Sequence, residues 1–181
     1  QDFDAEVQAA INRVQPYDEV RAAIDALRGI GIGGLRKGLL QCFRALPPSV
    51  VRGNASEIIA LANLWGLDSG VARDGVRGVD ATDSVETARP AAEALASFIH
   101  GAVAVSGERD LVTDGTLTVR SEGGSKLFTK ITGAGCSLGG VTATYLAVAE
   151  PLVAALAASL LYDRASEIAE AKSDGPGSFQ V

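Results

Sequence analysis

The residues best suited to chemistry form one short stretch, Thr132 to Cys136, directly before an apolar run over 137–149. Two glycines, Gly133 and Gly135, allow neighbouring backbone N–H groups to turn toward a common point because no Cβ interferes. A helix that begins immediately afterwards adds its own unpaired N–H groups and the positive end of its dipole. The stretch Gly133-Ala134-Gly135-Cys136 therefore predicts an anion site that fits a phosphate group or a developing oxyanion.

Cys136 stands at the junction between this turn and the helix. The field at a helix N-terminus favours the thiolate, which is the reactive form of cysteine. A plainer interpretation is equally open, in which the glycines only cap a buried helix and Cys136 is a small core residue.

A second candidate segment runs from Arg52 to Glu57 and follows the apolar pair Val50-Val51. An arginine suits phosphate, and a carboxylate suits Mg²⁺ held together with phosphates. The spacing of Asn54 and Glu57 also matches a capping box, so the Glu57 carboxylate can serve a helix N-terminus alone. A third segment begins at Ser106, which ends a fully apolar strand over 102–105.

The order of the predicted elements indicates an α/β fold with a βαβ unit and a hairpin insertion. Because ligands bind outside the carboxyl ends of strands in open α/β sheets, we expect the three segments to converge on one ligand. Helices are predicted over 1–28, 35–46, 55–62, 84–99, 137–149 and 151–172, and strands over 50–51, 102–105, 111–112, 117–119 and 126–131.

Composition limits the classes of function. The 181 residues are 47% hydrophobic, enough for one globular domain with a real core. A net charge of −6 without a basic patch argues against nucleic acid and against a membrane surface as partners. Two distant cysteines indicate a reducing, cytoplasmic compartment, and the single histidine, His100, has no partners for zinc.

A dinucleotide-binding oxidoreductase is a weaker alternative. Gly29, Gly31 and Gly34 match the letters of the G-x-G-x-x-G fingerprint. That fingerprint requires a strand before it, and the preceding residues here have a helical pattern.

Five segments of the sequence form a set: 52–58 (RGNASEI), 78–80 (GVD), 105–107 (VSG), 131–136 (ITGAGC) and 175–179 (GPGSF). In these residues and in this order, the chain resembles the hydroxyethylthiazole kinase family of the ribokinase-like superfamily. The resemblance implies a thiamine-pathway kinase, a homotrimer that uses ATP and Mg²⁺ to phosphorylate the hydroxyl group of 4-methyl-5-(2-hydroxyethyl)thiazole.

The same resemblance implies a role for each candidate residue. Cys136 would act as the base on the substrate hydroxyl, and the backbone from Gly133 to Cys136 would hold the transferring phosphoryl group, with Gly133 also touching substrate. Arg52 and Ser106 would contact ATP. Glu57 would lie near the metal ion.

The resemblance covers residues 29–181, which we expect to form the kinase domain. Residues 1–28 form a helical segment that does not align with the family, and the family's N-terminal part is expected to be missing. Arg28-Gly29 replaces an Asp-Pro pair of the family, so one metal-associated carboxylate is absent. A weakly active or inactive relative that serves as a nucleotide-binding or assembly module is therefore the alternative function.

Overall fold

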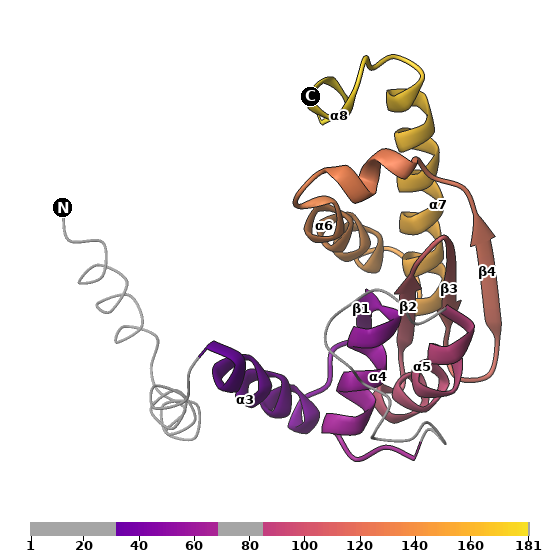
Figure 1. Ribbon diagram of the computed structural model, residues 1–181. Helices are drawn as coiled ribbons and strands as arrows, with labels where there is room; N and C mark the ends of the chain where they lie inside the picture. Colours follow the sequence, from indigo (N-terminus) through magenta and orange to yellow (C-terminus); the bar gives the residue numbers. More distant parts are fainter. Residues whose placement is uncertain (1–31, 69–84, 181) are drawn as a thin grey trace, which may run out of the picture. The chain divides into compact units, whose positions relative to one another are not determined.

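The computed structural model describes residues 32–68 and 85–180 (Figure 1). The chain divides into two compact units, Gln1–Leu46 and Pro47–Val181. In the first unit, α3 (Ile32–Ala45) confirms the helix predicted over 35–46. Gly34 lies inside this helix rather than in the turn that a dinucleotide fingerprint requires. The helix predicted over 1–28 and the segment 78–80 lie outside the described residues.

The second unit is built on a four-stranded mixed sheet with the strand order β1-β2-β3-β4. The first two strands are parallel, and the remaining neighbours are antiparallel, so the predicted α/β class and its hairpin are confirmed. Its elements are β1 (Val50–Asn54), α4 (Ala55–Leu64), α5 (Val85–Ile99), β2 (Ala102–Ser106), β3 (Arg109–Thr113), β4 (Thr118–Glu122), η2 (Lys126–Lys130), α6 (Ala134–Leu146), α7 (Pro151–Glu170) and α8 (Pro176–Phe179).

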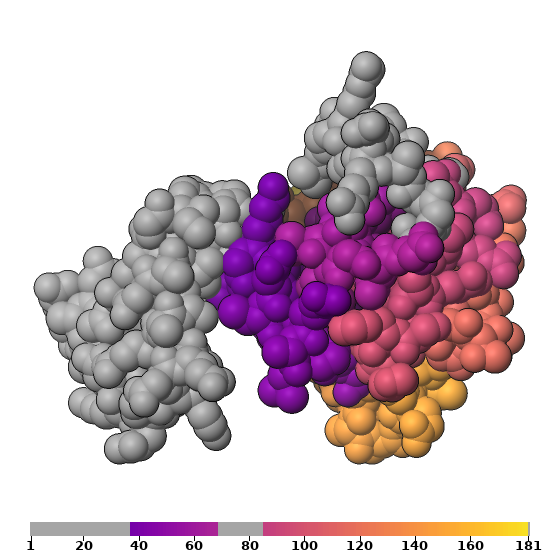
Figure 2. Space-filling model, turned by 90° about the horizontal axis from the view of Figure 1, so that it is seen from below, coloured from indigo at the N-terminus to yellow at the C-terminus, as the bar shows by residue number. Residues whose placement is uncertain are grey.

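Helices cover both faces of this sheet (Figure 1). The space-filling view shows α4 and α5 side by side on one face (Figure 2), and both helices contact β1 and β2. The long helix α7 packs against the opposite face, where Ala155 joins a buried cluster with Ala102, Ala104 and Val112. Alanines on both the helix and the sheet are small, so α7 can approach the sheet closely. The side chains of α7 are therefore the ones that cover this face.

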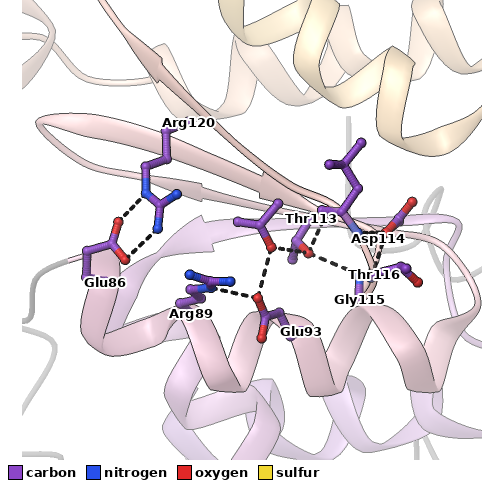
Figure 3. Close-up of polar contacts among 10 residues, drawn as sticks. Glu86, Arg89, Glu93, Thr113, Asp114, Gly115, Thr116 and Arg120 are labelled. Atoms are coloured by element: carbon purple, nitrogen blue, oxygen red, sulfur yellow. Dashed lines mark hydrogen bonds and ion pairs between the residues drawn. The ribbon is translucent and has the colours of Figure 1, made fainter.

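Polar side chains attach α5 to the β3–β4 hairpin (Figure 3). The Glu93 carboxylate accepts hydrogen bonds from Arg89 Nε at 2.7 Å and from Thr118 Oγ1 at 2.9 Å. Nearer the start of α5, Glu86 accepts two hydrogen bonds from the Arg120 guanidinium. The second pair is bidentate, a geometry that fixes orientation as well as distance. These contacts join Thr118 and Arg120 of β4 to α5 and so hold the hairpin against the helix.

One predicted strand and one predicted helix boundary are wrong. Residues 126–131 do not form a strand; η2 occupies Lys126–Lys130 and begins where the Ser125 hydroxyl accepts from the Leu127 N–H at 3.0 Å. Gly124, with a φ of +87°, turns the chain away from the sheet before this point, so the apolar residues pack on helices instead. In addition, α6 begins at Ala134 rather than at residue 137.

We predict that Gly101→Ala destabilises the second unit by about 1–3 kcal/mol, the usual cost of forcing extra atoms into a packed site. A Cβ at Gly101 would overlap the backbone carbonyl of Ser49, where β2 begins beside β1. The matched control is Gly139→Ala in α6, where a Cβ meets nothing within 4 Å. Denaturant unfolding should show the control to be neutral or slightly more stable, since alanine favours helix. Equal destabilisation by both variants would contradict the close approach at Gly101.

Candidate functional site

The parallel pairing of β1 and β2 brings Arg52 and Ser106 together. Asn54 pairs with Ser106 in the register of the two strands, so their carboxyl ends are level. From there the Arg52 Nη2 donates a hydrogen bond to Ser106 Oγ at 3.0 Å. Within the described residues, the buried Arg52 Nε has no hydrogen-bond partner. Two of the three predicted segments thus meet, and the guanidinium retains donors for an anion.

Two carboxylates, neither of them predicted from the sequence, lie near this guanidinium. Burial lowers the pKa of Arg52, while the negative charges of Asp110 and Asp163 raise it. Asp110 on β3 accepts a hydrogen bond from the Gly107 N–H at 3.0 Å. Burial raises the pKa of Asp110, and the Gly107 N–H and the Arg52 charge partly offset this.

Asp163 on α7 is the most strongly perturbed of these groups. Its pKa is raised to about 6, first by burial and then by repulsion from Asp110 and Glu167, with Arg52 opposing the shift. Burial is thus the main reason that the Asp163 carboxyl holds its proton more tightly, and the negative charges of its neighbours add to it.

Glu57 takes part in the capping box predicted for α4. The Asn54 side chain accepts from the Glu57 N–H at 2.9 Å, and Glu57 Oε2 accepts from the Asn54 N–H at 2.9 Å. The carboxylate thereby satisfies a backbone donor that the helix itself cannot pair. Its second oxygen has no capping partner among these hydrogen bonds, so the proposed metal role remains a prediction beside the structural one.

The third predicted segment forms the N-terminus of α6. Gly133 is the N-cap, with a φ of +92° that glycine adopts without strain. The first helical hydrogen bond runs from the Ser137 N–H to the Gly133 carbonyl at 2.9 Å. Helical geometry therefore leaves the N–H groups of Ala134, Gly135 and Cys136 without an acceptor inside the helix. Cys136 is exposed, so its interpretation as a core residue is wrong.

A cavity of about 220 Å³ lies beside this helix start. One wall is aromatic: Phe128 stacks on Tyr162 with ring centroids 5.1 Å apart and meets the edge of Phe179 at 5.6 Å. Thr132, Gly133 and Ala134 also line the cavity, whereas Arg52 does not. Tyr162 connects the two places, since it lines the cavity and lies near the Arg52 guanidinium.

Sequence reasoning missed Asp110, Asp163 and the aromatic wall. The signal for Asp110 was its spacing from Val112, because alternate residues of a strand share a face. The signal for Asp163 was its place one turn after Ser159 on the same stripe of α7 as Ala155. Neither spacing by itself indicates that Arg52 lies opposite.

Neither a metal-binding side-chain cluster nor a membrane-spanning helix occurs in the part of the chain that the structure describes. In residues 32–68 and 85–180, no group of three or more His, Cys, Asp or Glu side chains is arranged to hold a metal ion. No helix in the same ranges is both long and apolar enough to span a membrane.

The fold and the site define a class: an α/β protein with an arginine at the carboxyl ends of two parallel strands and, lining a separate cavity, a glycine-capped helix N-terminus. A model of the hydroxyethylthiazole kinase family matches residues 5–181. The chain belongs to this family, and the resemblance drawn from its motifs is confirmed.

Named relatives agree with this assignment. The chain is 65% identical over 161 residues to a hydroxyethylthiazole kinase of Bifidobacterium adolescentis, a match that covers 83% of this chain and 55% of that protein. It is 44% identical over 180 residues to the hydroxyethylthiazole kinase of Clavibacter sepedonicus, covering 95% and 62%. The chain thus spans only about half to three-fifths of the length of these relatives.

A solved structure has the same fold. The hydroxyethylthiazole kinase of Pyrococcus horikoshii OT3 superposes with a TM-score of 0.66 at 29% identity. The superposition covers 80% of this chain and 50% of that one. The mixed sheet with helices on both faces is therefore an arrangement shared with a family member.

We predict that the Asp163 carboxyl makes the stability of the fold depend on pH. Its folded pKa of about 6 lies above its ordinary value of 3.8, so the folded protein binds more protons between these values. The free energy of unfolding should therefore fall as pH rises from about 4 to about 6 and then level off. The stability gained by Asp163→Asn should grow over that window to about 1 kcal/mol, after allowance for solvent screening.

Urea unfolding at several pH values measures this difference. Glu170→Gln, which removes a charge from an exposed position on the same helix, is the control and should show no comparable change over this window. A constant difference between Asp163→Asn and the unmodified protein from pH about 4 to about 8 would contradict the prediction.

Proposed function

We propose that this protein is a kinase that transfers the γ-phosphoryl group of ATP to the hydroxyl of 4-methyl-5-(2-hydroxyethyl)thiazole. The observation that carries the proposal is the 65% identity with a protein named hydroxyethylthiazole kinase, which extends over 83% of this chain. The arginine and the helix N-terminus support it, because phosphoryl transfer depends mainly on positioning and on stabilisation of charge.

Arg52 has the properties required to bind a phosphate of the nucleotide. It is a half-buried cation, hydrogen-bonded to Ser106 through one nitrogen, and its Nε is free for an acceptor within the described residues. A guanidinium prefers phosphate because it offers several N–H donors in one plane. Ser106 fixes the direction of this plane and is itself proposed to contact ATP.

The N-terminus of α6 is proposed to hold the transferring phosphoryl group. The N–H groups of Ala134, Gly135 and Cys136 are the ones left without helical acceptors, and Gly133 lets the chain approach an anion closely. Gly133 lacks a side chain and meets nothing within 4 Å at its Cβ position, which agrees with the proposed contact to substrate.

Cys136 is proposed to take the proton from the substrate hydroxyl. It is exposed at the third residue of α6, where the unpaired N–H groups and the helix dipole stabilise a negatively charged sulfur. A thiolate can act as a general base only within hydrogen-bond reach of the hydroxyl, so the proposal requires the substrate to bind at this helix start.

The cavity beside α6 fits part of a nucleotide. Its volume of about 220 Å³ is below the usual range for a whole ligand site, so only the base would enter it, against Phe128 and Tyr162. When bound, ATP supplies the phosphoryl group and Mg²⁺ neutralises its charge. Glu57 is the residue proposed for the metal, because its carboxylate has one oxygen outside the capping box.

The predicted homotrimer and cytoplasmic location belong to the same proposal. Several large apolar side chains of α7 are exposed, as expected of a surface that another subunit covers. These residues are Val153, Leu160, Leu161 and Ile168.

We predict that Cys136→Ala lowers kcat by about 10²–10⁴, the usual contribution of a positioned base. The control is Cys42→Ala, which removes the other exposed cysteine, in α3, and should leave kcat unchanged. Mass spectrometry of thiazole phosphate, formed from ATP, Mg²⁺ and the thiazole alcohol, measures both. ATP binding without any thiazole phosphate in the unmodified protein would instead support the alternative of a nucleotide-binding module.

We predict that Glu57→Gln separates the metal role from the capping role. The glutamine amide oxygen still accepts from the Asn54 N–H, so the free energy of unfolding should change by less than about 0.5 kcal/mol. Activity should fall at least about tenfold, and more Mg²⁺ should be needed for half-maximal rate, because a neutral amide is a weaker ligand. An unchanged Mg²⁺ titration would show that Glu57 serves only as a cap.

A further inference from the structure

A cluster of partly buried charged side chains lies between β1, β3 and α7. Val50 on β1, Val112 on β3 and Ala155 on α7 pack together on one face of the sheet. Arg52 follows Val50 by two residues and Asp110 precedes Val112 by two, so both share that face, and Asp163 follows Ala155 by about two turns on the same stripe of α7. A half-buried guanidinium and two partly buried carboxylates therefore meet there, and the charges of both carboxylates act on Arg52. Among the described residues, Arg52 forms no close ion pair, and its side chain donates one hydrogen bond, to Ser106. The two carboxylates therefore act on Arg52 through space and leave its nitrogens available.

The two carboxylates differ in what else holds them. Asp110 accepts a hydrogen bond from the Gly107 N–H at 3.0 Å, directly after Ser106, so it is tied to the strand end that positions Arg52. Asp163 packs instead against the turn at Gly124, where an added Cβ would lie 2.9 Å from Asp163 Oδ1. Gly124 donates its N–H to Glu167 at 3.3 Å and not to Asp163. Asp110 is thus the structural counter-ion of Arg52, and Asp163 is the additional charge.

Asp163 also lies beside the cavity. Its neighbour Tyr162 and the nearby Ser166 both line that cavity, and Ser166 Oγ donates to the Asp163 carbonyl at 2.7 Å. The charged groups that act on the Asp163 carboxyl are Arg52 on β1, Asp110 on β3 and Glu167 on α7 itself. Glu167 is paired with Arg164, which leaves the Arg52 guanidinium as the cation acting on Asp163.

We propose that Asp163 is a positioning residue that competes with a bound phosphate group for the Arg52 guanidinium, so that removing its charge strengthens anion binding. The inference rests on the proposed function in taking Arg52 as the phosphate-binding residue. With both carboxylates ionised, the three groups carry a net charge of −1, and an incoming phosphate adds further repulsion at low dielectric. With Asp163 neutral, the net charge is zero and the guanidinium is shared only with Asp110.

This competition couples anion binding to proton uptake. The Asp163 carboxyl has a pKa of about 6 in the free protein, and a phosphate beside Arg52 would raise it further. By reciprocity, affinity for the anion rises as pH falls through this region. Each unit by which the bound anion raises the pKa corresponds to about a tenfold difference in Kd between the two protonation states.

The test is isothermal titration calorimetry of the full chain with inorganic pyrophosphate and, separately, with ATP. Asp163→Asn should bind both probes about three- to tenfold more tightly than the unmodified protein at pH about 8, and the difference should vanish near pH 5. The titration is repeated at pH about 6.5, midway between the two pH values compared, in buffers of different ionisation enthalpy. It should show that anion binding takes up protons and that Asp163→Asn reduces this uptake. Glu170→Gln is the charge-matched control and should behave like the unmodified protein.

The outcomes separate this inference from the proposed function. Equal affinities of Asp163→Asn and the unmodified protein at pH about 8, or weaker binding by the variant, would overturn the inference while leaving the kinase proposal standing. A variant effect on pyrophosphate in a protein that forms no thiazole phosphate would sink the kinase proposal and keep the inference. Absence of anion binding at every pH would overturn both. A thermal melt establishes that each variant is folded.

Discussion

The packing of α7 across the face of a parallel strand pair is the constraint on which the rest of the structure depends. β1 and β2 can run parallel only because the chain between them crosses over through α4 and α5 on the other face. Parallel strands end at the same edge, so Arg52 and Ser106 are neighbours although 54 positions separate them. The helix α7 then covers this face. Because it partly buries the charged side chains at the strand ends, solvent screens their interactions less.

Along α7 the packing changes from apolar to polar. Near its start, Ala155 packs with Ala102, Ala104 and Val112, and no polar atom needs a partner there. About two turns further on, the same stripe of the helix carries Asp163, and the strands opposite carry Arg52 and Asp110. One rigid helix thus anchors the fold with its first half and shapes an electrostatic site with its second. A shift of α7 would alter the core and the charges together.

The sequence predicted those features that depend on local pattern. The apolar run over 102–105 predicted a buried strand, and Asn54 with Glu57 three residues later matched a capping box; both are confirmed. The pattern of 126–131 was misread because its apolar residues pack on helices: Phe128 lies against Tyr162 and Phe179, which are distant in sequence. The charge balance at Arg52 depends on three elements at once, and no spacing within one element reveals it.

Local burial, rather than total charge, decides whether this chain attracts an anion. A net charge of −6 would repel a nucleotide at long range, but charges exposed to solvent are screened over about 10 Å at ordinary ionic strength. The N–H groups at the start of α6 are fixed dipoles at an exposed helix end and act only within the first turn. Arg52 is half-buried, so its charge acts at short range with little screening. The same burial strengthens the opposing charges of Asp110 and Asp163. On the proposed competition, an anion therefore meets a site whose net charge changes from −1 to zero with a single proton on Asp163, whatever the charge of the protein surface.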